Sequence, residues 1–345
     1  MGPHTAWIAS LSPWPDVFGL DRMRALLAEL GNPERTFPSV HVVGTNGKST
    51  ATRTIAAQLR LDGMSVGAYT SPHVSSWEER LDTDADSFER AVARIRPAAE
   101  AVRATQFEAL TAAALAEFAA KRVDAAVVEA GLGGRLDATN VLAARVVHLT
   151  NVGFEHTEVL GDTREAIARE KLAVVTPGAV VVLGEPEWKY LVPNNDVRSG
   201  GPREAAEAFL GHPVAQLVIS LPGRLERRAE DELWDGAHTP EAVDWLLERL
   251  ASNDWVVVVS LLSDKDVNGV LERLARASDR CVTTQSSNPR ALSAAELADR
   301  ARRYFSDVVA VEDPVAAVAH AHALGGRVLV TGSLYLLADL YAAAR

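Results

Sequence analysis

The residues with the most specific chemistry form one short run, Gly44–Thr50, which reads Gly-Thr-Asn-Gly-Lys-Ser-Thr. The run follows the apolar stretch Val40–Val43 and precedes a helical pattern, which is the setting that a phosphate-binding loop needs. Its glycines allow a tight turn, so that backbone amides and the helix N-terminus face phosphate oxygens. Lys48 would reach the outer phosphates, and Ser49 or Thr50 would contact phosphate or Mg²⁺. The run therefore predicts an ATP site, and a glycine-rich turn without a ligand is the other interpretation.

Three polar residues elsewhere in the chain end or follow apolar stretches and could hold the metal that ATP requires. Glu129 ends the stretch Asp124–Glu129, and His73 and His156 follow two others. Ligands gather at the carboxyl ends of parallel strands, so we expect Glu129 to lie near Lys48. Each residue has a plainer interpretation, because an acid at a strand end is often solvated and an isolated histidine is more often structural than a ligand.

The elements that position these residues alternate regularly along the first half of the chain. Helix-face spacing is found in Thr52–Leu59 and Phe107–Phe118. Strands separated by helices predict a parallel sheet with helices on both faces. The predicted strands of this half are Ser39–Val43, Ser65–Tyr69, Asp124–Glu129 and Val146–Thr150.

The same alternation begins again after residues 185–203, which are rich in Pro, Gly and Asn and are predicted to be a loop or linker. The sequence therefore predicts two α/β domains, residues 1–203 and residues 204–345. The predicted strands of the second are Trp255–Ser260, Cys281–Thr284, Val308–Val311 and Val328–Thr331, and its predicted helices are 240–251, 266–277, 293–303, 314–323 and 334–343.

Composition limits the kind of protein that this can be. The chain has 345 residues, of which 48% are hydrophobic, and its formal charge is −11 from 35 basic and 46 acidic residues. So acidic a chain is a poor general binder of nucleic acid or an anionic membrane. Cys281 is the only cysteine, which excludes a disulfide within the chain and a cysteine-based zinc site. The apolar runs are too short to span a bilayer and the N-terminus lacks a secretory pattern, so a cytoplasmic location is expected.

Further motifs carry a family resemblance, and they occur in the same order in both halves. The chain resembles folylpolyglutamate synthase and dihydrofolate synthase, the folate branch of the Mur ligase superfamily. The resemblance implies a P-loop Mur-ligase-type parallel-sheet ATPase domain followed by a smaller Rossmann-like α/β domain. The motifs that carry it are His41–Lys48, Thr70–His73, Phe107–Ala113, Glu129–Asn140, Glu155–Thr157, Ile167–Lys171, Pro222–Arg224, Asp235–His238, Asp264–Asp266 and Thr331–Tyr335.

The resemblance implies an ADP-forming ligase whose substrates are ATP, L-glutamate, and dihydropteroate or a reduced folate. ATP would phosphorylate a pteroate or folate carboxylate, and the glutamate amine would attack the acyl phosphate. It also implies two Mg²⁺ sites and a monomer. By carry-over, the nucleotide site comprises Thr45, Asn46, Gly47, Lys48, Ser49, Thr50, Arg224 and Asp235, and the metal ligands are Ser71, Glu129, His156 and Lys171. Phe107, Asp137 and Ala138 would bind the pterin, His238 and Ser333 would lie near glutamate, and Lys48, Lys171 and His238 would be the catalytic residues.

Lys171 matches the carbamylated lysine of the family, since a buried lysine of lowered pKa can react with CO₂ as the neutral amine. A plain exposed helix lysine is the alternative.

Three departures from the family pattern concern the nucleotide and its metal site. Ser49 stands where the folate enzymes usually have glycine, and Glu155 stands where they have aspartate. The stretch between Leu183 and Leu221 is shorter than in the family and lacks the His-Gln segment whose downstream asparagine contacts adenine. This shortening leaves a second hypothesis open, namely a non-catalytic nucleotide- or folate-binding homologue. A peptidoglycan Mur ligase fits less well, because only 43 residues precede Gly44 and those ligases need a domain there for the uridine nucleotide.

Overall fold

The computed structural model describes residues 2–15, 17–250 and 254–344, and the chain divides into two compact units, Met1–Ile219 and Ser220–Arg345. The division lies later than the predicted boundary after residue 203. The reason is helix α8 (Pro202–Leu210), which packs on α3 (Lys48–Leu61) through Ala205 and Phe209 in one apolar cluster with Ile55. Because these buried contacts tie α8 to the first unit, the connection between the units begins after it.

The first unit contains a six-stranded sheet in the order β2-β3-β1-β4-β5-β6, in which every neighbouring pair is parallel. All four strands predicted for this half are present. The predicted linker 185–203 is wrong, because it contains the short helix η3 and the edge strand β6. An edge strand that carries Asp196 and Arg198 lacks the apolar run by which the central strands are recognised. The strands are β1 (Ser39–Val43), β2 (Val66–Tyr69), β3 (Ala125–Glu129), β4 (Val146–Leu149), β5 (Val180–Leu183) and β6 (Asp196–Ser199).

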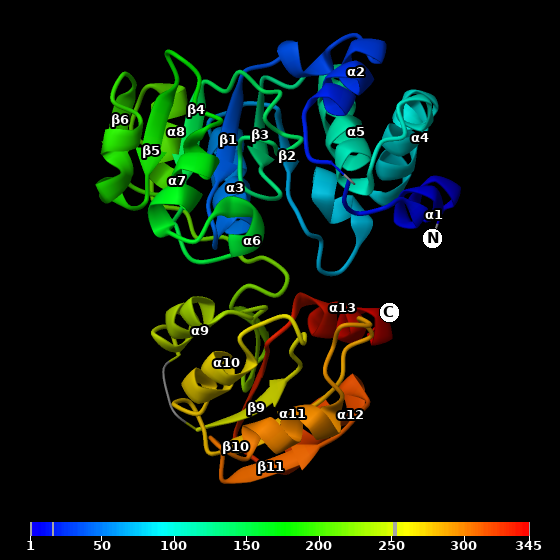
Figure 1. The fold of residues 1–345 in the computed structure, drawn as a ribbon, viewed down its shortest axis with the longest axis vertical. Coiled ribbons are helices and arrows are strands. Elements are labelled where there is room, and N and C mark those ends of the chain that lie inside the picture. Colours follow the sequence, from blue (N-terminus) through cyan, green and yellow to red (C-terminus); the bar gives the residue numbers. More distant parts are fainter. Residues whose placement is uncertain (1, 16, 251–253, 345) are drawn as a thin grey trace. The chain divides into compact units, whose positions relative to one another are not determined.

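Helices cover both faces of this sheet because successive strand residues point to opposite sides. Val146 and Val182 pack with α3 and α8, whereas Val147 and Val181 pack with α7. A third apolar cluster joins α1, α2, α4 and α5 around Tyr69, beside the β2 edge (Figure 1). The remaining helices are α1 (Pro3–Ser10), α2 (Asp21–Glu29), η1 (Pro33–Arg35), η2 (Trp77–Leu81), α4 (Ala85–Ala101), α5 (Gln106–Lys121), α6 (Thr157–Leu160), α7 (Arg164–Leu172) and η3 (Pro186–Leu191).

The second unit contains its own six-stranded sheet, in the order β11-β10-β9-β12-β8-β7, in which only β7 is antiparallel to its neighbour. The four predicted strands are present, and the charged hairpin β7–β8 is additional. Its strands are β7 (Glu226–Ala229), β8 (Glu232–Trp234), β9 (Trp255–Val259), β10 (Arg280–Thr283), β11 (Asp307–Ala310) and β12 (Arg327–Thr331).

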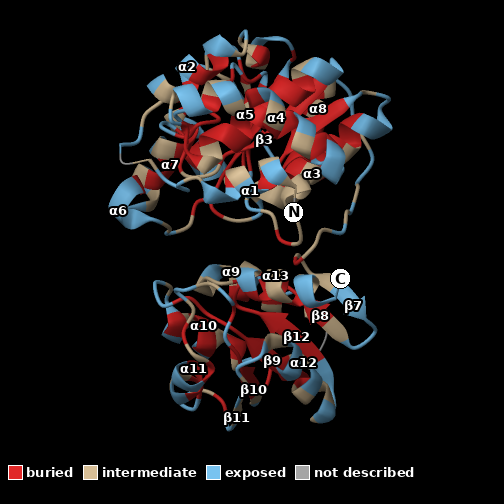
Figure 2. Cartoon of the chain, turned by 90° about the vertical axis from the view of Figure 1, so that its right-hand side faces the viewer, coloured by how far each residue is buried: buried red, intermediate tan, exposed pale blue. Residues whose placement is uncertain are grey.

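All five helices predicted for the second unit are present, and the predicted α/β class is confirmed in both units. In each unit the central strands are buried, the edge strands β6, β7 and β11 are half-buried or exposed, and the helices expose their outer faces (Figure 2). The first helix was predicted to reach residue 251 but ends at Leu247, and residue 251 lies outside the described residues. The helices are α9 (Pro240–Leu247), α10 (Val267–Leu274), α11 (Ala294–Ala301), α12 (Pro314–Ala323) and α13 (Leu334–Ala343).

Two further properties concern the described residues as a whole. Cys281 lies in β10 with 1% of its surface exposed, and burial raises the pKa of its thiol far above the ordinary value. Among the helices that the structure describes, none has the length and apolar character of a membrane span.

Candidate active site

The phosphate-binding loop connects β1 to α3 and is fastened to the end of the neighbouring strand β4. The backbone amide of Thr45 donates to the carbonyl oxygen of Asn151 at 3.0 Å, and that of Asn46 donates to the Asn151 side-chain oxygen at 2.9 Å. Thr150 donates its hydroxyl to the Asn46 carbonyl at 2.7 Å. Gly47 has a φ of +78°, a conformation that glycine adopts without strain. The loop is therefore shaped by two residues, Thr150 and Asn151, that the motif alone did not indicate.

Two lysine ammonium groups converge on this loop. Lys48 Nζ donates to the carbonyl oxygens of Gly44 and Thr45 at 2.9 and 3.0 Å, and Lys171 Nζ donates to the same Gly44 oxygen at 2.9 Å. Lys171 lies on α7, is only 1% exposed and forms an ion pair with Glu155, so the alternative of an exposed helix lysine is wrong.

The pKa values of this pair follow from burial and charge. Burial lowers the pKa of Lys171 to about 8, the charge of Lys48 acts in the same direction, and Glu155 opposes both. Burial alone would raise the pKa of Glu155, but the two ammonium groups outweigh it and hold that pKa below its ordinary value. The result is a concentrated positive charge beside the loop, compensated in part by one carboxylate.

Glu129 connects the phosphate-binding helix to the segment after β2. One of its carboxylate oxygens accepts a hydrogen bond from the Ser49 hydroxyl at 3.0 Å, and the other accepts from the Ser71 backbone amide at 2.9 Å. Glu129 is 1% exposed, so the interpretation as a solvated acid is wrong. Carboxylate and hydroxyl oxygens are the ligands that Mg²⁺ prefers, and this donor set fits such an ion.

The two candidate histidines differ in their surroundings. His73 Nδ1 accepts from the Arg80 guanidinium at 3.0 Å, its ring centroid lies 4.4 Å from that of Trp77, and burial, aided by Arg80, lowers its pKa to about 3. His73 therefore has structural partners. His156 is the N-cap residue of α6, has a φ of +44° and keeps 40% of its side chain exposed. Within the described ranges, no three His, Cys, Asp or Glu side chains gather as a metal cluster.

The glycine turn after β3 brings the predicted pterin residues together. Asp137 accepts hydrogen bonds from the amides of Gly131 and Leu132 at 3.0 and 2.8 Å, and its other oxygen accepts from Thr139 at 3.0 Å. Burial raises the pKa of Asp137 despite these bonds. The ring of Phe107 lies against Gly131, where an added Cβ would come within 2.5 Å of it. Asp137 thus organises the turn. Phe107 packs against the turn, and the buried Ala138 directly follows Asp137 in the sequence.

Most of the predicted residues of the second unit lie at the carboxyl ends of β8 and β12. Asp235, 5% exposed, accepts from the Leu225 and Ala237 amides at 2.8 and 2.9 Å, and burial raises its pKa. His238 Nδ1 lies 2.7 Å from the Gly236 carbonyl oxygen, and Ser333 caps α13. Arg224 donates to the Gly223 carbonyl oxygen at 3.0 Å.

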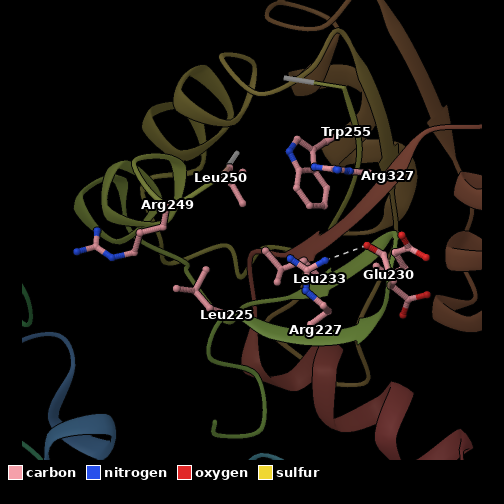
Figure 3. A pocket seen from close by; sticks show the side chains of 9 residues that line it. Leu225, Arg227, Glu230, Leu233, Arg249, Leu250, Trp255 and Arg327 are labelled. Atoms are coloured by element: carbon pink, nitrogen blue, oxygen red, sulfur yellow. Dashed lines mark hydrogen bonds between the residues drawn. The ribbon is translucent and has the colours of Figure 1, made fainter. Parts of the chain in front are cut away.

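A surface hollow in the same unit contains none of the predicted residues. It lies toward the amino ends of β9 and β12, where Trp255 and Arg327 line it (Figure 3). Asp235 and Ser333 instead follow the carboxyl ends of β8 and β12. The β7–β8 hairpin forms one wall of the hollow, and Arg227 in β7 donates a hydrogen bond of 3.0 Å to the Glu230 carbonyl oxygen in the turn of that hairpin. This hollow is therefore separate from the candidate active site.

Comparison with known proteins decides the family. Residues 42–198 match the Mur ligase middle domain, and residues 223–334 match the Mur ligase glutamate ligase domain. The dihydrofolate synthase/folylpolyglutamate synthase of Mycobacterium tuberculosis is 30% identical over 388 positions, covering 85% of this chain and 80% of that protein. The chain belongs to the dihydrofolate synthase/folylpolyglutamate synthase family. The alignment is longer than this 345-residue chain, so the relative has segments that are missing here.

Solved structures agree with this family assignment. The folylpolyglutamate synthase of M. tuberculosis complexed with ADP has a TM-score of 0.88 at 28% identity, covering 99% of this chain and 97% of that one. The bifunctional synthase of Yersinia pestis, complexed with AMPPNP and a Mn ion, has a TM-score of 0.85 at 27% identity and covers 100% and 98% of the two chains. The predicted fold and the predicted class, an ATP-dependent ligase that forms ADP, are confirmed, and the non-catalytic alternative is not favoured.

Proposed function

We propose that this member of the dihydrofolate synthase/folylpolyglutamate synthase family joins L-glutamate to dihydropteroate, to reduced folates, or to both. The observation that carries the proposal is the convergence of Lys48 and Lys171 on one carbonyl oxygen, that of Gly44, within the phosphate-binding loop. Phosphoryl transfer is catalysed mainly by positioning and by neutralising charge on the phosphate oxygens. Two ammonium groups held beside a phosphate loop supply such a field before the nucleotide arrives.

The reaction then proceeds in two displacements. A carboxylate oxygen of the acceptor attacks the γ-phosphorus of ATP, the bond to the β–γ bridging oxygen breaks, and ADP leaves. The amine of glutamate attacks the acyl carbon, the amide bond forms, and phosphate leaves while the amine loses a proton. Lys48 would stabilise the phosphate charge, Phe107 would stack on the pterin ring, and His238 and Ser333 would lie near glutamate. Arg224 and Asp235 would contact the nucleotide.

The Ser49 hydroxyl and the Glu129 carboxylate, whose oxygens lie 3.0 Å apart, support a divalent cation site in this reaction. Ser49, Ser71, Glu129 and His156 would hold Mg²⁺, which when bound neutralises phosphate charge and orients the transferred group. A second cation site would use Lys171 as a carbamate, and in that form the positive charge at the loop would come from Lys48 and the bound cations instead of the Lys171 ammonium. That modification would place two anions together at Lys171 and Glu155, so it requires a cation between them. A CO₂-depleted assay tests it, since bicarbonate should then restore activity.

The decisive test measures ADP release with MgATP and L-glutamate in the presence of dihydropteroate, tetrahydrofolate or no acceptor. We expect release that depends on both glutamate and one acceptor, and the preferred acceptor names the activity. Lys48→Ala should abolish it, whereas Lys121→Ala, which changes a lysine about half exposed on α5 of the same unit, should not. Nucleotide binding without ADP release in the presence of either acceptor would contradict the proposal.

The composition bears on location and assembly. The formal charge of −11 suits small-molecule substrates better than nucleic acid. We infer a cytoplasmic monomer, and light scattering coupled to gel filtration would test the oligomeric state.

A further inference from the structure

Residues 70–82, here called the β2–α4 segment, form a compact loop held by its own hydrogen bonds. The Thr70 amide donates to the Arg80 carbonyl oxygen at 2.9 Å, which brings the two ends together. The Glu79 carboxylate lies inside and accepts from the backbone amides of Val74, Ser75 and Ser76 at 2.9, 2.7 and 2.9 Å. The internal shape of the segment is therefore fixed, and its position depends on its contacts with the rest of the unit.

Leu81 of the segment packs in the apolar cluster around Tyr69, and Arg53 of α3 provides polar contacts. Its guanidinium donates to the Glu79 carbonyl oxygen and forms an ion pair with Asp82, and its side chain is only 14% exposed. Arg60, two turns further along the helix, bonds the other Asp82 oxygen at 2.7 Å. Burial would raise the pKa of Asp82, but the two guanidinium groups outweigh it, so this carboxylate is charged at neutral pH.

The first residues of the segment in chain order reach the candidate metal site. Ser71 donates its amide to Glu129, which also accepts the hydroxyl of Ser49. Ser49 and Arg53 are four residues apart and share one face of α3. A single helix that begins at the phosphate loop therefore contacts the segment at both ends, through Glu129 at one and through Arg53 at the other.

We propose that Arg53 is a positioning residue that fixes the β2–α4 segment, and with it Ser71, relative to the phosphate-binding loop. The inference deepens the proposed function and rests on it. The two terminal nitrogens of the planar Arg53 guanidinium reach the Glu79 carbonyl and the Asp82 carboxylate separately, in a fixed fork, whereas lysine has a single nitrogen and no such fork. Arg53 should therefore not be replaceable by lysine, although the charge is retained.

The test compares Arg53→Lys and Arg53→Ala with the control Arg60→Ala, which removes one Asp82 contact and the hydrogen bond from Arg60 to the Val66 carbonyl oxygen, and leaves the Glu79 contact. Amide hydrogen exchange in residues 70–82 should quicken at least tenfold in both Arg53 variants and less than threefold in the control. The kcat for glutamate-dependent ADP release should fall about 10- to 100-fold with KM for glutamate unchanged, because misplaced reacting groups slow turnover by such factors.

Several results would overturn the inference. Exchange in the segment and kcat within twofold of the wild type in Arg53→Lys would show that the guanidinium fork is dispensable. Loss of activity in step with the folded fraction, and exchange that quickens over the whole unit, would show a general structural role. A wild type that releases no glutamate-dependent ADP would instead defeat the proposed function, and with it the catalytic part of this inference.

Discussion

Replacing Gly44 by alanine should damage the phosphate-binding loop in a way that can be worked out from the structure. Gly44 has a φ of +145°, and an added Cβ would lie 1.9 Å from the Thr150 hydroxyl oxygen. The backbone strain costs about 1–3 kcal/mol. Moving the Thr150 hydroxyl away also breaks its bond to the Asn46 carbonyl oxygen, which contributes about 0.5–1.5 kcal/mol. We expect the first unit to lose about 2–4 kcal/mol of unfolding free energy.

The same distortion should weaken nucleotide binding. The loop amides must keep their arrangement to face phosphate, so part of the strain makes the free energy of nucleotide binding less favourable in the variant. If about 2 kcal/mol is lost in this way, the affinity for MgATP falls about 30-fold. Urea denaturation would measure the stability, and isothermal calorimetry would measure the affinity.

Two further variants separate the causes. Gly178 also has a positive φ, +86°, but an added Cβ meets nothing within 4 Å, so Gly178→Ala should cost about 1 kcal/mol and leave nucleotide affinity unchanged. In the double variant Gly44→Ala/Thr150→Ala the clash is relieved, and the combined loss should be smaller than the sum of the single losses by about 1 kcal/mol. A Gly44→Ala protein that binds MgATP within twofold of the wild type, or strictly additive losses, would refute the reasoning.

Three other predictions concern charge and stacking. Burial lowers the pKa of His41 to about 4, so this residue binds a proton at a lower pH in the folded state than in the unfolded chain. Its contribution to the unfolding free energy is therefore fully present above pH 6.5 and is lost as the pH falls towards 4. Between pH 7 and 5 the loss at this residue is about 2 kcal/mol, and urea denaturation of His41→Asn should show a pH dependence weaker by that amount. Glu155→Gln should destabilise the unit by about 3 kcal/mol at pH 7 and by much less at pH 9, where Lys171 is largely neutral, whereas the exposed Glu158→Gln should change neither value. Equal losses of stability at the two pH values would contradict that charge argument. Phe107→Leu should raise KM for the pteridine acceptor about 3- to 10-fold through lost stacking, without raising KM for ATP. Steady-state kinetics with both substrates varied would measure the two KM values, and an unchanged KM for the acceptor would show that the ring is only part of the core.

The central strands could be predicted from the sequence because burial on both faces demands continuous apolar, β-branched runs. The edge strands β6 and β7 could not, because one side of an edge strand meets solvent and tolerates residues such as Arg198 and Arg227. The division of the structure after Ile219 lies later than the predicted boundary for a related reason. The contacts of α8 are made with α3, which lies well over a hundred residues earlier, and no local pattern records them.

The candidate site shows the same division between local and distant information. The phosphate loop could be predicted because its glycines and Lys48 are consecutive and their spacing determines the turn. Asn151 and Arg53 could not, because their roles arise from bonds to the main chain of segments remote in sequence. The pairing of Lys171 with Glu155 is another fact of packing, since both side chains occur in ordinary helical or loop surroundings when read along the chain.

The burial of Cys281 has a practical consequence. A thiol sealed within β10, with its pKa raised far above neutrality, presents almost no thiolate to reagents in water. A cysteine introduced at an exposed position, such as Lys121, would then be the single group that a maleimide dye can reach. The natural chain thus accepts a fluorophore at one chosen point without prior removal of native cysteines.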